Sequence, residues 1–170
     1  MRPPIHFALY CLGIAEPQTQ TSATERDAIA RHAANKTVAA EIGVWHGVTT
    51  RRIAEALAPE GVVYAIDNYV VGRFGISFPY AIARWNTKPF RKRVKFVRAT
   101  AKEAAAEFAK SGTKFEVVFI DGDHSYDGLR TDWESWTPCG SVIYTREVVR
   151  RDDRFALVEE VDTLTVLRRK

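Results

Sequence analysis

The sequence has few cysteines, no long hydrophobic run and no repeated or low-complexity segment. Its 170 residues include two cysteines, Cys11 and Cys139, and neither belongs to a CxxC pair or a Cys/His cluster with zinc-ligand spacing. This usage excludes a disulfide framework, argues against a structural zinc, and predicts reduced thiols in the cytoplasm. No apolar stretch is long enough to span a bilayer, so we expect no membrane partner.

The N-terminus has the outline of a short signal peptide. Arg2 precedes an apolar run over residues 5–15, and the run ends in small residues. Against export, His6 interrupts the run and the basic region is a single arginine. The cytoplasmic interpretation is therefore preferred, with export as the alternative.

Size and composition are those of an ordinary globular protein, with 46% hydrophobic and 27% charged residues. We expect residues 1–170 to form a single domain. The net charge of +4 is mild, but basic residues gather between positions 88 and 98, with Phe90 and Phe96 among them. Such a stretch can bind RNA. The favoured interpretation is a solvated loop leading into a strand whose Phe96 faces the core, so nucleic acid is not an expected partner.

After residue 20, apolar periodicity predicts alternating helices and strands. Helices are expected at about 24–35, 49–57, 101–109 and 126–136, with strands at 37–44, 61–66, 94–99, 115–120 and 141–145. Residues 69–92 are the least readable, with 80–85 able to form a helix. The tail, 155–169, predicts two strands with a turn near Asp162 and Thr163. The pattern indicates an α/β fold: a Rossmann-like, doubly wound, mostly parallel sheet with helices on both faces.

The connection after the fifth strand is short. About nine residues, 146–154, separate it from the next strand, whereas a parallel crossover needs a dozen or more. The sequence therefore predicts a shortened, antiparallel C-terminal edge. Little chain would then cover a site at this edge, which would be open, would take a large ligand, or would be covered by a second copy in a homo-oligomer.

Ligands of such sheets bind at the carboxyl ends of the strands. The first strand runs into the segment EIGVWHGVT, in which Gly43 and Gly47 are spaced GxxxG and Glu41 precedes them. Glycines permit a tight turn and close approach of a ligand to the backbone. The spacing differs from the GxGxxG of NAD-binding proteins. It resembles motif I of class I methyltransferases, which wraps the methionine and ribose of S-adenosylmethionine; a plain strand–helix turn is the alternative. The predicted cofactor-binding residues in this segment are Glu41, Gly43, Val44, Trp45, Gly47 and Thr49.

Asp67 ends the second strand, about 20 residues after Gly47. A carboxylate at this place can accept hydrogen bonds from both hydroxyls of a ribose. The alternative is a turn aspartate at a strand end. Asn68 and Thr100, which follow the second and third strands, are also predicted to bind the cofactor.

The fourth strand ends in the segment IDGDHSY, which begins at Ile120. With EIGVWHGVTTRRIAEAL and GVVYAID it resembles a family of class I methyltransferases that includes macrolide sugar O-methyltransferases. The resemblance covers about residues 24–145. It implies methyl transfer from S-adenosylmethionine to a hydroxyl of a small molecule or sugar. An RNA methyltransferase remains a further alternative.

The resemblance also implies roles for two residues after the fourth strand. Asp121 matches an aspartate that contacts the cofactor and, in metal-dependent members, binds magnesium beside the acceptor hydroxyl. His124 matches a proposed general base, and imidazole titrates near neutral pH. His46 is the rival candidate, or else a solvent-facing loop residue. The alternative for Asp121 and His124 is a helix-capping turn with Asp123 or Ser125 as the cap.

The sequence departs from this family after the fifth strand. Metal-dependent relatives carry an acidic pair there, whereas this chain has Thr145 and Arg146, with Glu147 one position late. Magnesium at Asp121 is therefore possible but not favoured. The departure also leaves a second function open, a catalytically degenerate module that binds the cofactor or serves in assembly.

Overall fold

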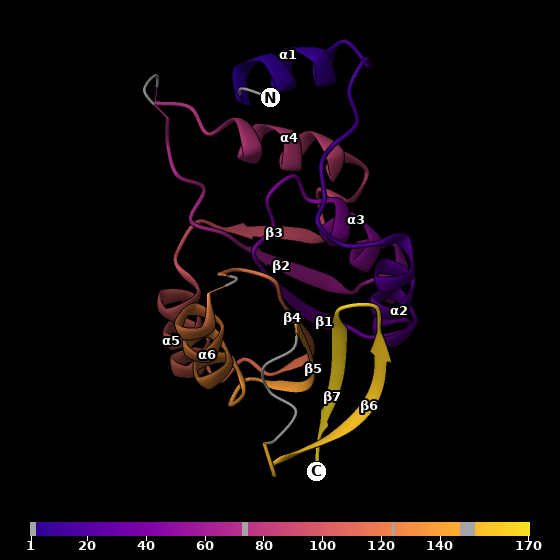
Figure 1. The fold of residues 1–170 in the computed structure, drawn as a ribbon, viewed down its shortest axis with the longest axis vertical. Coiled ribbons are helices and arrows are strands. Elements are labelled where there is room, and N and C mark those ends of the chain that lie inside the picture. Colours follow the sequence, from indigo (N-terminus) through magenta and orange to yellow (C-terminus); the bar gives the residue numbers. More distant parts are fainter. Residues whose placement is uncertain (1–2, 73–74, 124, 147–151) are drawn as a thin grey trace.

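The computed structural model describes residues 3–72, 75–123, 125–146 and 152–170. In this part of the chain, helices cover both faces of a seven-stranded sheet (Figure 1). The strands are β1 (Val38–Ile42), β2 (Val62–Ile66), β3 (Val94–Val97), β4 (Phe115–Ile120), β5 (Gly140–Arg146), β6 (Phe155–Val161) and β7 (Leu164–Arg169). The helices are α1 (Pro3–Cys11), α2 (Ala23–Ala33), α3 (Val48–Ala56), α4 (Phe78–Asn86), α5 (Ala101–Ser111) and α6 (Tyr126–Trp136), with a 3₁₀ turn, η1 (Lys88–Phe90).

The sheet order is β3-β2-β1-β4-β5-β7-β6. Strands β1 to β5 pair in parallel, while β7 pairs antiparallel with both β5 and β6. The predicted α/β architecture, with its antiparallel C-terminal edge, is therefore confirmed. Reversal of the order between β1 and β4 creates a switch point, where open parallel sheets bind ligands.

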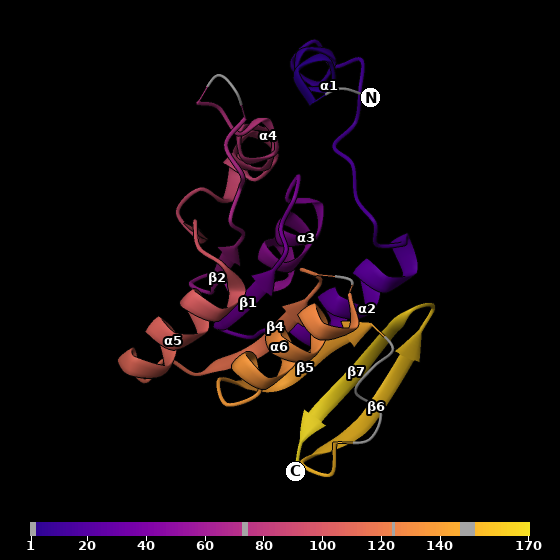
Figure 2. The same cartoon turned by 60° about the vertical axis from the view of Figure 1, so that its left-hand side comes forward.

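Alternation along the strands builds two apolar cores. Ala39 and Phe119 belong to the core on the α2 and α3 side, whereas Ala40 and Ile120 belong to the core on the α5 and α6 side. Figure 2 shows the two helical layers on opposite sides of the sheet. Successive strand residues face opposite ways, so a polar residue such as Glu41 must enter one of these cores.

Three of the helices begin with a side-chain cap. Ser22 caps α2 and Thr100 caps α5, each in a capping box with the glutamate three residues later. Ser125 caps α6 by accepting a hydrogen bond from the Gly128 backbone N–H. The turn after β4 therefore does contain a helix cap, which leaves Asp121 outside the capping interaction.

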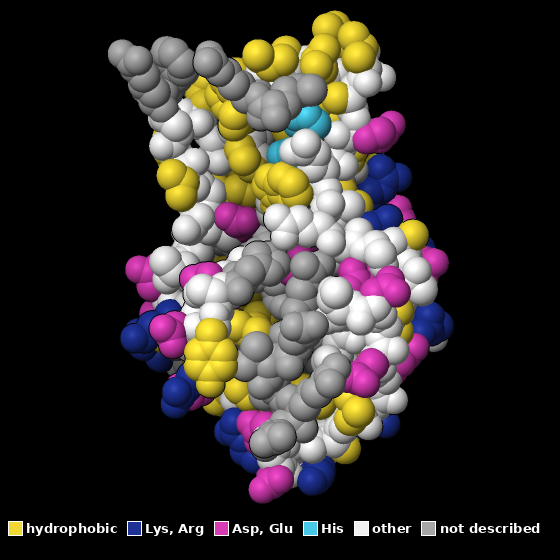
Figure 3. All heavy atoms as spheres, in the orientation of Figure 1, with side chains coloured by type: hydrophobic (Ala, Val, Ile, Leu, Met, Phe, Trp, Pro, Cys, Tyr) yellow, Lys and Arg dark blue, Asp and Glu magenta, His cyan; other side chains and the backbone are white. Residues whose placement is uncertain are grey.

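The apolar run at the N-terminus forms α1, which lies against α4 at one end of the molecule, away from the sheet (Figures 1 and 2). The Phe7 and Phe78 rings are 5.4 Å apart. On the face drawn in Figure 3, hydrophobic side chains and histidine gather at this end, and most Lys and Arg side chains lie lower or to the right. Among the described helices, none is long and apolar enough to cross a membrane.

The segment that was hardest to interpret contains α4, which extends the possible helix at 80–85 in both directions. The basic stretch comprises η1, the turn after it and β3, so it leads into a strand as predicted. Phe96 is partly buried and packs against Tyr80 with ring centroids 5.4 Å apart, which agrees with the predicted core-facing position.

The C-terminal tail forms the predicted hairpin, with its turn at Asp162 and Thr163. This turn is fastened to the start of α2. Ser22 donates to the Asp162 carboxylate at 2.6 Å, and Glu25 accepts from the Thr163 backbone N–H at 3.1 Å. Residues 147–151, in the short connection before the hairpin, lie outside the described residues.

Candidate cofactor site

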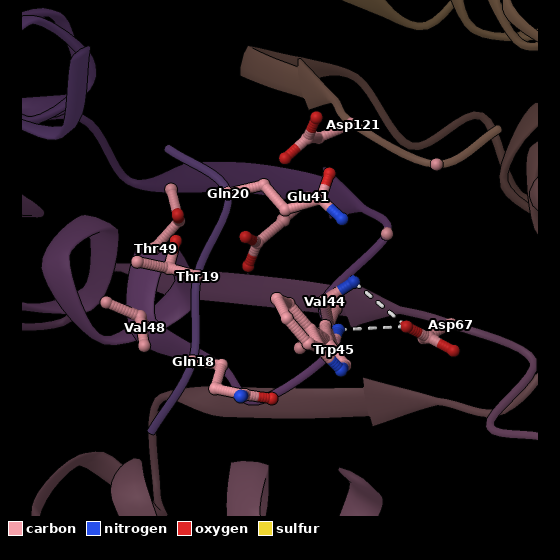
Figure 4. Close-up of a pocket in the computed structure, with 12 residues that line it drawn as sticks. Gln18, Thr19, Gln20, Glu41, Val44, Trp45, Val48, Thr49, Asp67 and Asp121 are labelled. Atoms are coloured by element: carbon pink, nitrogen blue, oxygen red, sulfur yellow. Dashed lines mark hydrogen bonds between the residues drawn. The ribbon is translucent and has the colours of Figure 1, made fainter. Parts of the chain in front are cut away.

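Two pockets lie at the carboxyl ends of β1, β2 and β4, with cavity volumes of about 250 and 590 Å³. Gly43, Asp67 and Gly122 line both pockets, so the two cavities adjoin. The smaller is also lined by Gln18, Thr19, Gln20, Glu41, Val44, Trp45, Val48, Thr49 and Asp121 (Figure 4). The larger is also lined by Ile42, Ile66, Asn68, Ala99, Thr100, Ala101, Asp123 and Asp132.

Gly43 brings the loop after β1 against the turn after β4. Its φ is +86°, and a Cβ there would lie 2.6 Å from the Asp121 carbonyl carbon and 2.7 Å from the Gly122 Cα. Both the backbone conformation and the close approach therefore require glycine. Gly47, with φ of +70°, precedes α3 and faces Ala83. It lies outside both pocket linings, so of the two glycines only Gly43 faces the cavity.

Asp67 anchors the glycine loop. Its Oδ2 accepts hydrogen bonds from the backbone N–H groups of Val44 and Trp45, both at 3.0 Å (Figure 4). Its Oδ1 accepts from Tyr69 N–H at 2.8 Å. Each carboxylate oxygen can accept more than one hydrogen bond, so acceptor capacity remains for a ligand. Asp67 thus joins the loops after β1 and β2 while lining both pockets.

Glu41 is a buried acid at the back of the smaller pocket, with an exposure of 1%. The Thr50 hydroxyl, on α3, donates a hydrogen bond to its carboxylate. Burial raises the pKa of Glu41 well above its usual value, and the nearby charges of Asp121 and Asp67 add to this rise. Three carboxyl groups therefore surround one small cavity, an arrangement that favours a cationic ligand.

The wall opposite β1 comes from the N-terminal strap, residues 12–21, which links α1 to α2. The Gln18 backbone N–H donates to His46 Nδ1 at 2.9 Å, and Thr21 shares a hydrogen bond with Thr49 at 3.1 Å. The strap thereby brings Gln18, Thr19 and Gln20 to the pocket, and sequence reasoning missed all three. They carry no motif, and only the docking of the strap places them at the site.

His46 fits neither interpretation offered by the sequence. It is buried rather than solvent-facing, stacks against His6 and Trp45, and does not line either pocket. Burial, with a smaller contribution from His6, lowers its pKa to about 4. Because Nδ1 already accepts the Gln18 N–H, this ring fastens the strap to the glycine loop and is not placed as the general base.

A second buried acid, Asp132, lies on α6 in the wall of the larger pocket. A Cβ on Gly122 would lie 2.9 Å from its Oδ2, and it accepts a hydrogen bond from the Asp123 backbone N–H. Burial is the largest cause that raises its pKa, to about 6. Sequence reasoning missed it, although an acid between Leu129 and Trp133 on the buried stripe of α6 was a visible signal.

Some of the residues predicted to take part in catalysis or metal binding lie outside the part of the chain that the structure describes. His124 and Glu147 lie outside the described residues, as does the side chain of Arg146. Thr145 is fully buried in β5. Across the described residues, no group of three or more His, Cys, Asp or Glu side chains is arranged to hold a metal ion. The role of His124 and the place of magnesium at Asp121 stay predictions.

The structure brings the other predicted cofactor residues together. Glu41, Val44, Trp45, Thr49 and Asp121 line the smaller pocket. Asn68 and Thr100 line the larger one, and Gly43 and Asp67 line both. Neighbouring parallel strands end at one edge of the sheet, so residues that follow different strands meet there. Fold and site together define an α/β protein with a nucleoside-cofactor type of pocket at its switch point.

Comparisons with known proteins specify this class further. A family model for the methyltransferase domain matches residues 40–141, more than half of the chain, and the chain therefore belongs to this family. The prediction of a methyltransferase that uses S-adenosylmethionine is thereby confirmed. No curated protein sequence matches the chain.

Two solved structures share the fold. An O-methyltransferase from Bacillus cereus, in complex with SAH, superimposes with a TM-score of 0.70 at 16% identity, covering 100% of this chain and 91% of that one. A putative O-methyltransferase from Klebsiella pneumoniae gives a TM-score of 0.67 at 18% identity, covering 98% and 88%. At these identities the likeness concerns the fold. The strap and the hairpin lie outside residues 40–141 and are included in these superpositions.

Proposed function

We propose that residues 1–170 form a single-domain O-methyltransferase that transfers the methyl group of S-adenosylmethionine to a hydroxyl of a small molecule or sugar. The observation that supports this proposal most strongly is the adjoining pair of pockets at the ends of β1, β2 and β4, with Asp67 lining both. The DGDHSY segment after β4 and the two O-methyltransferases of the same fold favour oxygen as the acceptor atom.

The residues present fit this cofactor. Asp67 and Asp121 offer negative charge to its sulfonium and ammonium groups in the smaller pocket, and the buried Glu41 adds a third carboxyl group whose ionisation a bound cation would favour. We propose that Asp67, which lines both cavities, binds the ribose hydroxyls. Ile66, Ala99 and Ala101 offer apolar wall to a purine in the larger pocket. When bound, the cofactor supplies an electrophilic methyl group.

The chain's own groups must hold the acceptor and remove its proton. Asp121 lines the smaller pocket at the end of β4, and His124 follows three residues later in the chain. A positioned base speeds such reactions by about 10²–10⁴-fold. We therefore propose His124 as the general base, with the acceptor beside the turn after β4.

Calorimetric titration with SAH tests the first half of the proposal. We expect binding to the wild-type chain and weakened binding to Asp67→Ala. No detectable binding at millimolar SAH would contradict the proposed function.

Methyl transfer from radiolabelled S-adenosylmethionine to hydroxylated acceptors, including macrolide sugars, tests the second half. His124→Ala should lower turnover by about 10²–10⁴-fold and leave SAH affinity nearly unchanged. EDTA should not abolish activity, because Thr145 and Arg146 replace an acidic pair. Loss with EDTA that magnesium restores would show a metal site.

The second candidate is a degenerate module that binds the cofactor without turnover. The short connection between β5 and β6 favours it, since little chain is available there to cover an acceptor. SAH binding together with no transfer to any acceptor tested would favour this candidate. A homo-oligomer, measured by light scattering, would instead point to cover from a second copy.

A further inference from the structure

Charge is divided unevenly along the chain. Residues 68–102 contain nine Lys and Arg residues and no Asp or Glu, although the whole chain has a net charge of only +4. The remainder is therefore net acidic. Positive charge of this density on one segment favours an anionic partner, provided that the fold gathers the side chains on one surface.

The fold does gather them. A groove of about 800 Å³ runs between α4, η1 and β3, and Arg84, Lys88, Arg91 and Lys95 all line it. Its remaining lining consists of Tyr80, Ala81, Trp85, Thr87, Val94 and Phe96, so no carboxylate contributes to it. The groove shares no lining residue with either cofactor pocket.

Trp85 is the aromatic centre of this groove. The residue is 60% exposed, and the Lys88 ammonium lies 5.2 Å from its ring centroid. Together with Lys88 and Arg91 it also lines an adjoining groove of about 490 Å³. An exposed tryptophan between cationic side chains offers a stacking surface beside charges that can contact phosphates.

The cations of the groove also differ from others on the surface. Arg31, Lys110 and Arg130 each pair with a glutamate, at 2.6, 2.8 and 3.0 Å. In the described part of the chain, Arg84, Lys88 and Arg91 form no ion pair. Arg93 differs again, since it donates to the Leu57, Ala58 and Gly61 carbonyls and has a structural role.

We propose that this groove binds single-stranded nucleic acid, with phosphates on Arg84, Lys88 and Arg91 and a base stacked on Trp85. Sequence alone favoured a solvated loop leading into a strand for this stretch, and nucleic acid was not an expected partner. The shared groove, the absence of carboxylates from its lining and the exposed Trp85 favour binding instead. Phosphate contact and stacking do not depend on base sequence, so binding should be tolerant of sequence and equal for RNA and DNA.

Fluorescence anisotropy with labelled (rU)₁₂ and (dT)₁₂ tests this on the full chain. The R84A/K88A/R91A variant should bind at least tenfold more weakly at low salt, and the slope of log affinity against log salt should fall by about two. The matched control is R31A/K110A/R130A, which removes the same charge from paired residues and should bind as the wild type does. Trp85→Ala should weaken binding about tenfold, and Trp85→Phe should restore part of it.

Thermal melting of each variant separates a folding defect from a binding defect. The proposal is overturned if the wild type shows no binding at low salt and about 100 µM protein, the concentration at which non-specific contacts are still detected. It is also overturned if both triple variants lose affinity equally, or if Trp85→Ala binds unchanged. Tight binding to phosphatidylserine vesicles without binding to either oligonucleotide would assign the surface to a membrane instead.

Discussion

Two turns meet at the cofactor site, and a buried ionisable group links each of them to another segment of the chain. The loop after β1 is fastened by Asp67 and by His46, whose ring accepts the Gln18 N–H. The turn after β4 is supported by Asp132, which accepts the Asp123 N–H. Burial lowers the pKa of the base to about 4 and raises that of the acid to about 6. The same cause therefore gives the two turns opposite responses to pH.

The two turns touch at Gly43, and the largest expected effect comes from separating them. In Gly43→Ala, the new Cβ would meet the backbone of Asp121 and Gly122, and neither can move aside without displacing β4. We expect a loss of about 4 kcal/mol or more in unfolding free energy, with SAH binding abolished. Urea unfolding and calorimetry would measure both.

Gly112→Ala is the matched control for this substitution. Gly112 also has a positive φ, +70°, but nothing lies within 4 Å of its added Cβ. Gly112→Ala should lower the unfolding free energy by only about 1 kcal/mol, because it introduces backbone strain alone. Equal losses in the two variants would show that the contact between the turns contributes nothing.

Asp67→Ala should have the next largest effect, because three backbone N–H groups lose their acceptor. We expect a loss of about 3 kcal/mol in unfolding free energy in addition to the weaker SAH binding. Asp67→Asn, which keeps one acceptor oxygen, should recover part of both. A variant of wild-type stability would show that the glycine loop holds its shape without Asp67.

His46→Asn keeps an acceptor for the Gln18 N–H and removes the titration. Since the folded pKa of about 4 lies below the ordinary 6.5, the unfolded chain binds the extra proton between these values. The unfolding free energy of the wild type should therefore fall by up to about 3 kcal/mol relative to that of the variant as pH falls through this window. If the unfolding free energies of the two proteins change in parallel between pH 4 and 7, His46 is not buried in its neutral form.

Asp132→Asn should give the opposite slope and a slightly smaller effect. Its folded pKa of about 6 lies above the ordinary 3.8, so the folded state binds the extra proton in this window. The unfolding free energy of the wild type should fall by about 2–3 kcal/mol relative to that of the variant as pH rises from 4 to 6.5. Urea unfolding at four pH values measures the slope, and a difference that grows toward acid would refute the assignment.

Much of this molecule could be predicted from local sequence. Periodicity and capping residues placed five parallel strands and their helices to within a few residues, because buried strands and amphipathic helices leave short-range patterns. Gly43, Asp67 and Asp121 could be assigned to one site without a structure, since each directly follows a parallel strand. The antiparallel C-terminal edge followed from the length of one connection.

The contacts that join these strand-end residues to distant segments could not be predicted from local sequence. His46 and Gln18 are 28 positions apart, and Asp132 reaches a turn on the preceding segment from within α6. No local pattern encodes such contacts, because they depend on how α1, the strap and α6 pack. Whether a histidine titrates, or a stretch of basic residues forms a groove, is set by burial and by distant neighbours. Local patterns were enough to predict the sheet and its strand-end residues, whereas the packing of distant segments selects the polar groups that hold the site in shape.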